Sequence, residues 1–272
     1  MQQATPKAAM HAVGVIPARY QSSRFPGKPL ALIGGKTLVQ RVFERARAAS
    51  RIARLLVATD DERIAAAVRA FGGEVVMTSS AHASGTDRLA EVAGEVPADL
   101  FVNIQGDEPL LDPQDIDRLV ECLEQDPSPD MATLADSLLE FDQARDPNIV
   151  KVVCDAGGRA LYFSRSPIPY VPGCENGDLT GAAGGRTRVE SHEAGRPRPW
   201  LRHVGLYAYR RGFLLEFASW SPGTLESLEG LEQLRALERG RTIRVLQARG
   251  RYHGVDTPAD VRAVERALLG SS

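Results

Sequence analysis

The sequence predicts an α/β protein whose mostly parallel, Rossmann-like sheet lies between two layers of helices, and three observations predict it. Short apolar runs without helical spacing alternate with segments whose apolar residues recur at helical spacing. The apolar runs end in polar residues, glycine or proline, as buried parallel strands do where they open into a loop. Finally, 43% of the 272 residues are hydrophobic, which is enough to bury one substantial core.

The first predicted strand, around Val13 and Val15, ends in a loop over residues 17–29 that concentrates groups able to bind phosphate. The cations are Arg19, Arg24 and Lys28, and the hydroxyls are those of Ser22 and Ser23. Gly27 would let the backbone approach a ligand. Cations and free N–H groups at the carboxyl end of a first strand favour a phosphate site. A solvated loop would have the same composition, and this stretch alone does not separate the two interpretations. Neither GxxxxGK[ST] nor GxGxxG occurs, so the loop matches neither of these common phosphate motifs.

Helices and strands then alternate as far as about residue 105. The pattern predicts helical segments over residues 37–49, 62–71 and 87–93, and strands over residues 54–59, 74–78 and 100–105. Ser84 stands just before the third helical segment, where the simplest interpretation is an N-cap. This alternation predicts a three-layer α/β/α fold with ligands at the carboxyl ends of its strands.

The alternation loosens after Met131, where MATLADSL and NIVKVVCD are strand-like and ALYFSRSPIPY reads as an extended arm. We therefore predict an inserted antiparallel region over about residues 131–210. Within it, residues 172–199 are rich in glycine and charge and contain almost no large apolar side chain. Such a segment cannot bury enough apolar surface to offset the entropy of ordering, so a mobile loop is predicted.

The last part of the chain is predicted to contain two strands and two helices. A strand is predicted over residues 201–209, a helix over residues 225–239 and a strand over residues 242–248. The chain closes with GVDTPADV, a predicted strand end followed by an N-capped, Pro-started helix. We expect residues 1–10 to form a disordered tail and residues 11–272 to form a single domain.

Composition excludes several classes of function. The formal net charge is −2, from 33 Lys and Arg against 35 Asp and Glu, which gives no field that favours nucleic acid or an anionic membrane. Cys122, Cys154 and Cys174 lack CxxC spacing, so they indicate neither a zinc site nor a disulfide framework. No segment has the length of a membrane span or the pattern of a leader, and a cytoplasmic protein is expected.

Two carboxylates stand at predicted strand ends. Asp107, in NIQGDEP, follows a buried strand through Gly106, and Asp256, in GVDTP, occupies a similar corner before a helix. Carboxylate oxygens suit magnesium, which bridges phosphate oxygens. For Asp256 the competing interpretation is a helix cap, and the spacing alone favours the cap.

Eight motifs, in order, resemble the sugar-activating nucleotidyltransferase family and most closely its 3-deoxy-manno-octulosonate (KDO) cytidylyltransferases. They are IPARYQSSRFPGKPL, VATDDERI, GGEVVMTSSAHASGTDRLAEV, VNIQGDEPL, VKVVCDAGGRALYFSRSPIPY, LRHVGLYAYR, LEGLEQLRALE and GVDTPADV. The resemblance implies an enzyme that transfers CMP from CTP to the anomeric hydroxyl of KDO. The products are CMP-KDO, used in lipopolysaccharide biosynthesis, and pyrophosphate. It also implies Mg²⁺ as cofactor and a homodimer formed through the inserted antiparallel region.

The resemblance also implies roles for single residues. The catalytic residues would be Arg19, Arg24, Lys28 and Asp107. The nucleotide-binding residues would be Ala18, Arg19, Ser22, Lys28, Ser84, Gly85, Arg88 and Gln105. The sugar-binding residues would be Gln105, Arg165, His203, Tyr207, Glu232 and Gln233, with Arg165 a candidate partner of the sugar carboxylate. For the metal, the resemblance favours Asp107 together with Asp256.

Alternatives remain for several of these positions and for the function. A histidine on a strand face is more often structural, and Glu232 and Gln233 would look the same on a solvated helix face. A sibling enzyme acting on another acceptor would keep the nucleotide loop but change the motifs RHVGLY and LEQLR. A catalytically silent nucleotide sensor would have lost a metal ligand or a phosphate clamp, whereas Asp107, Asp256 and Lys28 are all present.

Overall fold

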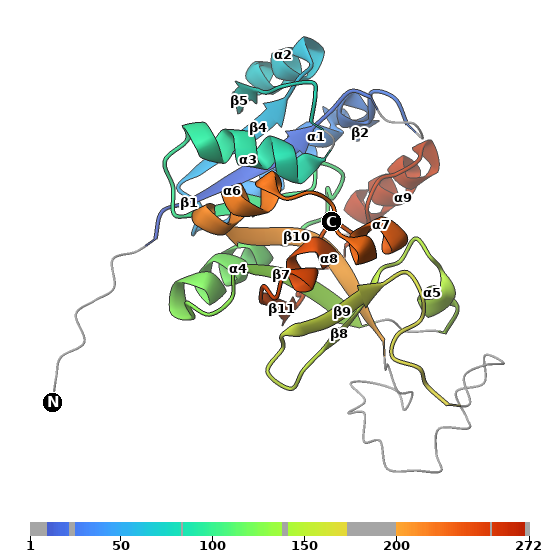
Figure 1. Cartoon of the computed structure of the whole chain (residues 1–272). Helices are drawn as coiled ribbons and strands as arrows, with labels where there is room; N and C mark the ends of the chain where they lie inside the picture. Colours follow the sequence, from blue (N-terminus) through green and yellow to red (C-terminus); the bar gives the residue numbers. More distant parts are fainter. Residues whose placement is uncertain are drawn as a thin grey trace, which may run out of the picture. The chain divides into compact units, whose positions relative to one another are not determined.

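The computed structural model describes residues 10–21, 25–82, 84–137, 141–172, 200–250 and 252–269 (Figure 1). It divides into two compact units. Unit 1 contains Met1–Met131, Leu206–Ser219 and Arg249–Ser272, and unit 2 contains Ala132–Gly205 and Trp220–Ala248. The expected tail over residues 1–10 and the expected mobile loop over residues 172–199 lie, except for Met10 and Pro172, outside the described residues, and both stay predictions.

Unit 1 is built on a mostly parallel sheet, as predicted. Its strands are β1 (Ala12–Ala18), β4 (Arg54–Thr59), β5 (Glu74–Met77), β6 (Leu100–Asn103) and the last part of β10 (Leu201–Arg210). They lie in the order β10-β6-β1-β4-β5. β1 pairs in parallel with β4 and β6, and β4 pairs in parallel with β5, whereas β10 is antiparallel to β6. All residues of β1 are buried except the half-buried Pro17, so both faces of the central strand are covered.

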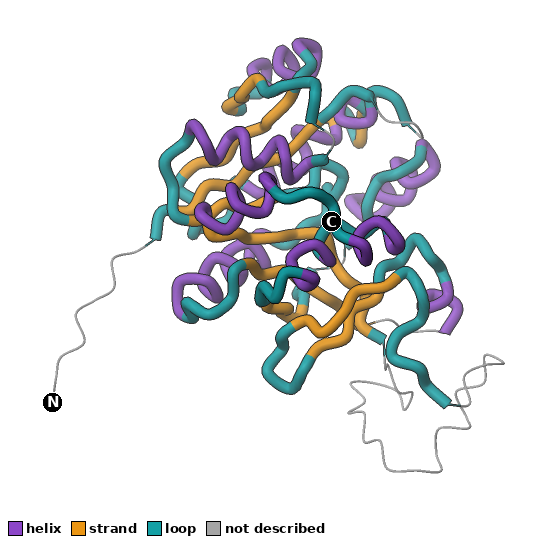
Figure 2. Tube along the Cα trace, in the orientation of Figure 1, coloured by secondary structure: helices purple, strands orange, loops and turns teal. Residues whose placement is uncertain are grey.

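Helices pack against this sheet in two groups. They are α1 (Leu38–Ala46), α2 (Glu62–Ala70), α3 (Gly85–Glu95), α4 (Pro113–Gln125), α6 (Arg211–Ser219) and α9 (Pro258–Leu269). α3 and α6 contact each other and α3 contacts β1 and β6, while α1 and α4 contact each other and the same sheet (Figure 2). These two pairs cover a central strand that is buried on both faces, which is the predicted α/β/α arrangement.

The first half of the chain follows the predicted order closely. Thr37 caps α1 through its hydroxyl, Asp61 caps α2 and Ser84 caps α3, so the N-cap interpretation of Ser84 is confirmed. One helix, α4, is absent from the elements predicted above, although the sequence contains signals for it. Asp112 caps it, Pro113 is its first residue, and its apolar residues recur at helical spacing.

A short ribbon interrupts unit 1 before α1. A 3₁₀ turn, η1 (Lys28–Leu30), is followed by β2 (Leu32–Ile33) and β3 (Lys36–Thr37), which pair antiparallel. Gly34 and Gly35, with φ of 53° and 77°, form the turn between them.

Unit 2 contains the antiparallel region. Its strands are β7 (Met131–Ser137), β8 (Lys151–Cys154), β9 (Ala160–Ser164), the first part of β10 and β11 (Ile243–Gln247). β8 pairs antiparallel with both β9 and β10. The helices are α5 (Phe141–Arg145), α7 (Thr224–Glu229) and α8 (Leu234–Glu238). This unit includes Trp220–Ala248, which lies beyond the predicted limits of the insertion.

The prediction of one helix over residues 225–239 is wrong. The chain forms α7 and α8 instead, separated at Gly230, whose φ of 61° and ψ of 41° end α7 in the left-handed region. Glycine adopts this conformation without steric cost and commonly ends helices. The break places Glu232 between the two helices and Gln233 at the N-cap of α8.

Across the described residues, no helix is long and apolar enough to cross a membrane.

Candidate active site

The loop after β1 is held in a fixed turn. Ala18 ends β1, and the backbone N–H of Gly27 donates to the carbonyl of Tyr20 at 2.9 Å. Gly27 has a φ of 72°, and a Cβ at this position would lie 3.2 Å from the Tyr20 ring. Glycine is therefore required both by the backbone conformation and by the ring. This turn fixes the start of η1, and with it Lys28.

Asp107 is positioned by a close approach between two strand ends. It follows β6 in a turn in which the N–H of Glu108 donates to the carbonyl of Gln105 at 3.3 Å. A Cβ on Gly106 would lie 2.9 Å from the carbonyl oxygen of Pro17, near the end of β1. Any side chain at position 106 would push this turn away from β1, so the glycine in QGDEP is what lets Asp107 approach the first loop.

Asp256 is brought to the same place by bonds from distant parts of unit 1. The N–H of Val255 donates to the carbonyl of Asp107 at 2.9 Å. Buried Asp115, on α4, accepts hydrogen bonds from the N–H groups of Arg249 and Gly250, at 3.0 and 3.2 Å to its Oδ2, and anchors the chain upstream.

The helix that follows Asp256 has its own cap. The carboxylate of Asp260 accepts hydrogen bonds from the N–H groups of Asp256 and Thr257, at 3.0 and 2.7 Å, and from the Thr257 hydroxyl at 2.9 Å. Burial alone would raise the pKa of Asp260, but these hydrogen bonds hold it below its usual value. Asp256 itself lies two residues before the start of α9.

These elements converge on one ammonium group. Lys28 Nζ lies 2.6 Å from Asp107 Oδ2 and 3.3 Å from Asp256 Oδ1. The Lys28 side chain is 18% exposed, against 30% for Asp107 and 47% for Asp256. Three residues that are far apart in the sequence thus form one cluster, the Lys28 cluster, in which one positive charge faces two negative charges.

Arg19 and Gln105 follow the carboxyl ends of β1 and β6. Arg19 directly follows β1 and is exposed, and within the part of the chain that the structure describes its guanidinium forms no ion pair. Gln105 is half-buried in the turn that leads to Asp107. Ser22 and Arg24 lie outside the described residues, and their predicted roles stay predictions.

The predicted nucleoside segment sits at the amino end of α3. Ser84 and Asp87 form a capping box, each side chain accepting the other's backbone N–H at 3.1 Å. Gly85 is close to Pro17, since a Cβ there would lie 3.5 Å from the proline ring. Arg88 is buried, and its guanidinium donates to the Thr78 hydroxyl and lies 3.4 Å from the Asp60 carboxylate.

Arg63, on α2, supports the first loop through a contact that the sequence does not predict. The Arg63 guanidinium lies over the Tyr20 ring, with Cζ 3.3 Å from the ring centroid, and it also pairs with Asp61 at 2.6 Å. Tyr20 in turn packs over Gly27, next to Lys28. The motif VATDDERI contains both Asp61 and Arg63, but nothing in the sequence indicates that they reach the first loop.

In unit 2, His203 is held as a neutral base. Its Nε2 lies 3.1 Å from the Thr133 hydroxyl, which itself donates to the carbonyl of Val204 at 3.1 Å. The ring packs edge-on against Phe163 at 5.1 Å. Burial lowers the pKa of His203 to about 3, because the charged imidazolium would lose its hydration.

The Arg165 guanidinium is bonded to main chain. It donates to the carbonyls of Glu229 at 2.8 Å, Pro147 at 2.8 Å and Gly230 at 3.4 Å. These bonds support a structural role for Arg165 in joining α7 to the neighbouring loop. Its predicted contact with a sugar carboxylate stays a prediction.

The other predicted sugar-binding residues are divided between the units. Tyr207 belongs to unit 1, where it pairs with Asn103 in the sheet and its ring lies 5.8 Å from that of Tyr209. Glu232 and Gln233 belong to unit 2, where the Glu232 carboxylate lies 3.8 Å from the Arg235 guanidinium and Gln233 is buried.

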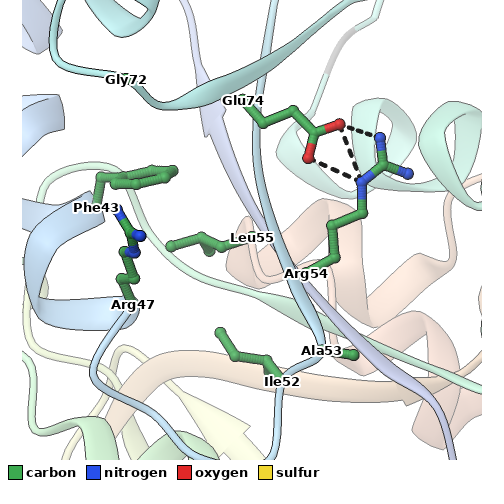
Figure 3. A pocket seen from close by; sticks show the side chains of 8 residues that line it. All are labelled: Phe43, Arg47, Ile52, Ala53, Arg54, Leu55, Gly72 and Glu74. Carbon is green, nitrogen blue, oxygen red and sulfur yellow. Dashed lines mark hydrogen bonds and ion pairs between the residues drawn. The ribbon is translucent and has the colours of Figure 1, made fainter.

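A surface cavity lies elsewhere in unit 1. It has a volume of about 290 Å³ and is lined by Phe43, Arg47, Ile52, Ala53, Arg54, Leu55, Gly72 and Glu74 (Figure 3). Arg54 and Glu74, which begin β4 and β5, form an ion pair at its edge. The cavity therefore opens at the amino ends of the strands, whereas the Lys28 cluster lies at their carboxyl ends, where α/β sheets bind ligands.

Cations and carboxylates at the strand ends of such a fold suit phosphoryl or nucleotidyl transfer, which depends on positioning and charge neutralisation. The sequence profile of the cytidylyltransferases matches residues 13–243. The chain belongs to the cytidylyltransferase family.

Curated relatives match the chain from end to end. The 3-deoxy-manno-octulosonate cytidylyltransferase of Syntrophotalea carbinolica is 52% identical over 263 residues, which cover 96% of this chain and 100% of the relative. The enzyme of that name from Geobacter sulfurreducens is 50% identical over 259 residues, covering 95% of this chain and 100% of the relative. The resemblance inferred from the eight motifs is confirmed.

Solved structures agree. The structure of CMP:2-keto-3-deoxy-manno-octonic acid synthetase complexed with CTP is 42% identical, covers 96% of this chain and 100% of its own, and superposes with a TM-score of 0.84. The 4-diphosphocytidyl-2C-methyl-D-erythritol synthase of Anaerococcus prevotii, at 11% identity and a TM-score of 0.61, shares the fold alone.

Proposed function

We propose that this protein transfers CMP from CTP to the anomeric hydroxyl of KDO, giving CMP-KDO for lipopolysaccharide biosynthesis and releasing pyrophosphate. The observation that carries the proposal is the Lys28 cluster, where a lysine and two aspartates from three distant segments meet at the strand ends. Relatives at 50–52% identity that are named for this activity support the substrate assignment.

The residues fit a magnesium ion. Asp107 and Asp256 both reach a single point, the Lys28 ammonium, so their oxygens can share one cation. Carboxylates of this kind, with phosphate oxygens and water, are the ligands that Mg²⁺ prefers, and among the described residues no larger cluster of metal-binding side chains competes. When bound, Mg²⁺ would neutralise phosphate charge and favour ionisation of the sugar hydroxyl.

The protein's own side chains would position the substrates and neutralise their charge. Lys28 and the exposed Arg19 would offset the charge that grows on the triphosphate and the leaving pyrophosphate. Arginine can do so with two parallel hydrogen bonds, while lysine acts as a point charge. Arg24 and Ser22 would add to this set. Ala18, Ser84, Gly85, Arg88 and Gln105 would form the nucleoside side.

For the acceptor we propose Gln105, Arg165, His203, Tyr207, Glu232 and Gln233. His203, uncharged above its lowered pKa of about 3, can exchange hydrogen bonds with sugar hydroxyls but cannot supply positive charge at neutral pH. A sugar carboxylate would then need an arginine, and Arg165 is the proposed partner.

A homodimer is part of the proposal. Leu161 on β9 and Tyr170 on the arm that follows it are 60% and 69% exposed, although both are large apolar side chains. An exposed apolar arm of this kind is typical of a surface that is covered in an oligomer. Sedimentation at micromolar concentration tests the dimer, and a monomer would contradict it. Because CTP is an intracellular nucleotide, we further propose that the protein works in the cytoplasm.

The proposed reaction is tested by incubating the protein with Mg²⁺, one nucleoside triphosphate and a panel of acid sugars, and following pyrophosphate release. We expect release with CTP and KDO and much slower release with UTP or with sialic acid. Turnover with another acid sugar but not with KDO would overturn the acceptor. CTP binding without turnover of any acceptor would favour a nucleotide sensor.

A further inference from the structure

We infer that Lys28 is an internal counter-ion of the metal site: its ammonium holds the Asp107 and Asp256 carboxylates together in the free enzyme and must leave them before a divalent cation can bind. This inference rests on the proposed function, because it concerns the same carboxylates. It adds an order of events in which metal enters together with the nucleotide.

The geometry makes the ammonium and a metal ion mutually exclusive. Lys28 Nζ lies within 2.6 Å of Asp107 Oδ2 and 3.3 Å of Asp256 Oδ1. A magnesium ion bound to the same two oxygens would require oxygen distances of about 2.1 Å, so it would occupy the same point as the ammonium. The cluster cannot hold both cations between these oxygens.

The charges explain why the ammonium stays until another cation arrives. The Asp107 and Lys28 side chains are only 30% and 18% exposed, so the Asp107 carboxylate is partly desolvated and needs a cation beside it. A Mg²⁺ ion from solution has to displace this ammonium and to shed part of its own strongly held water. Free metal is therefore a poor competitor for the carboxylate pair.

A nucleotide changes this balance, because it offers the displaced ammonium a new partner. The lysine side chain has four rotatable carbon–carbon bonds and its charge is a compact point, so Nζ can turn from the carboxylates to a phosphate without movement of η1. The backbone of η1 is fixed by the bonds of Gly27 to Tyr20 and of Leu30 to Gly27, both at 2.9 Å. The triphosphate thus provides the new partner for the lysine and further oxygens for the metal.

The test measures Mn²⁺ binding to the free protein by electron paramagnetic resonance, in the absence of nucleotide. We expect Lys28→Gln to bind Mn²⁺ at least about tenfold more tightly than the wild type, or about 1.4 kcal/mol. Arg19→Gln is the matched control, because it removes an equal charge from the same loop without touching either carboxylate, and we expect less than a threefold change. Lys28→Arg keeps the charge and should bind Mn²⁺ as weakly as the wild type.

Thermal unfolding provides a second measurement. Mn²⁺ should raise the Tm of Lys28→Gln more than that of the wild type, because it replaces the missing counter-ion. If Lys28→Gln does not fold, Lys28→Met serves in both measurements. Equal Mn²⁺ affinity of wild type and Lys28→Gln would overturn the inference while leaving the proposed function intact. Absence of Mn²⁺ binding in every variant, with or without CTP, would overturn both.

Discussion

A lysine in each unit of this protein, Lys28 in unit 1 and Lys151 in unit 2, lies among groups that differ in charge. In unit 1, Lys28 contacts two side-chain carboxylates from distant segments. In unit 2, Lys151 is fully buried and donates to the carbonyls of Asp146, Ile149 and Arg165, the first at 3.0 Å, while Arg165 donates to three further carbonyls. Backbone carbonyls are neutral and fixed, so Lys151 and Arg165 hold segments of the chain together.

The difference shows how a charged cluster that can bind a ligand is distinguished from a cation with a structural role. Burial lowers the pKa of Lys151, and the positive charge of Arg165 adds to this effect, while the negative charges of Asp146 and Glu229 oppose it. The Lys28 cluster instead carries an excess of negative charge at the carboxyl ends of parallel strands, where a ligand can reach it. Two carboxylates facing one ammonium leave an excess negative charge that a further cation can neutralise, whereas the carbonyl partners of Lys151 leave none.

The largest expected effect separates two neighbouring aspartates of unit 1. Asp256→Asn should keep its Tm but lose at least about tenfold in kcat, or about 1.4 kcal/mol, because a charge is removed from the reacting centre. Asp260→Ala should do the reverse, losing about 1 kcal/mol of stability because three capping hydrogen bonds disappear, with kcat little changed. Normal turnover by Asp256→Asn together with a lowered Tm would restore the cap interpretation. Steady-state kinetics and calorimetry on the same preparations decide this.

The clamp of unit 2 is tested by Arg165→Met. We expect a loss of about 1–3 kcal/mol in the free energy of unfolding, because carbonyls of Glu229, Pro147 and Gly230 lose their donor. Arg159→Met in the same antiparallel hairpin is the control, because its side chain is 62% exposed and pairs only at the surface with Asp155. Urea unfolding measures both. Unchanged stability would contradict the clamp, and a raised KM for the acid sugar would support the proposed contact of Arg165 with the sugar carboxylate.

His203 predicts a pH dependence of stability. Its folded-state pKa of about 3 lies below the ordinary value of 6.5, so below pH 6.5 the unfolded chain binds the proton more readily. Its contribution to stability is complete above pH 6.5 and decreases as the pH falls towards 3, by at most about 1.4 kcal/mol per pH unit. His203→Asn should flatten the curve of unfolding free energy in this window. Parallel curves for wild type and His203→Asn would show that the histidine accepts a proton in the folded state.

The smallest expected effect concerns the contact between Arg63 and Tyr20 that supports the first loop. Arg63→Gln removes a cation–π contact with Tyr20 at an exposed position, so the KM for CTP should rise about two- to fivefold with kcat less affected. Arg69→Gln, on the same helix and paired with Glu62 at the surface, is the control. Initial rates at varied CTP measure both variants, and a KM for CTP that matches the wild type would show that Tyr20 needs no support from α2.

Much of unit 1 could be predicted, because its signals are local. The apolar run at Val13 and Val15, the cap residue Thr37 and the paired glycines after α2 each act within a few residues. Even the two errors had local signals: Pro113 after Asp112 marks the overlooked α4, and Gly230 marks the break that divides the predicted helix.

The sequence predicted which residues belong to the candidate site, but not how they come together. Lys28, Asp107 and Asp256 could be named from their motifs, but they are separated by 79 and 228 positions and meet through contacts that no local pattern encodes. The bond from Val255 to Asp107 and the close approach of Gly106 to Pro17 are such contacts. Likewise, nothing in the sequence around Arg165 shows that its guanidinium is used by carbonyls.

The account depends on Asp107 and Asp256 acting as one centre, and a double-mutant cycle on kcat tests this most directly. Residues that act as a unit have effects that do not add, because the first substitution already disables the shared function. We predict that Asp107→Asn and Asp256→Asn each lower kcat at least about tenfold and that the double variant lies within about threefold of the slower single variant. A double variant whose loss equals the product of the two single losses would show two independent contributions and would contradict a shared centre.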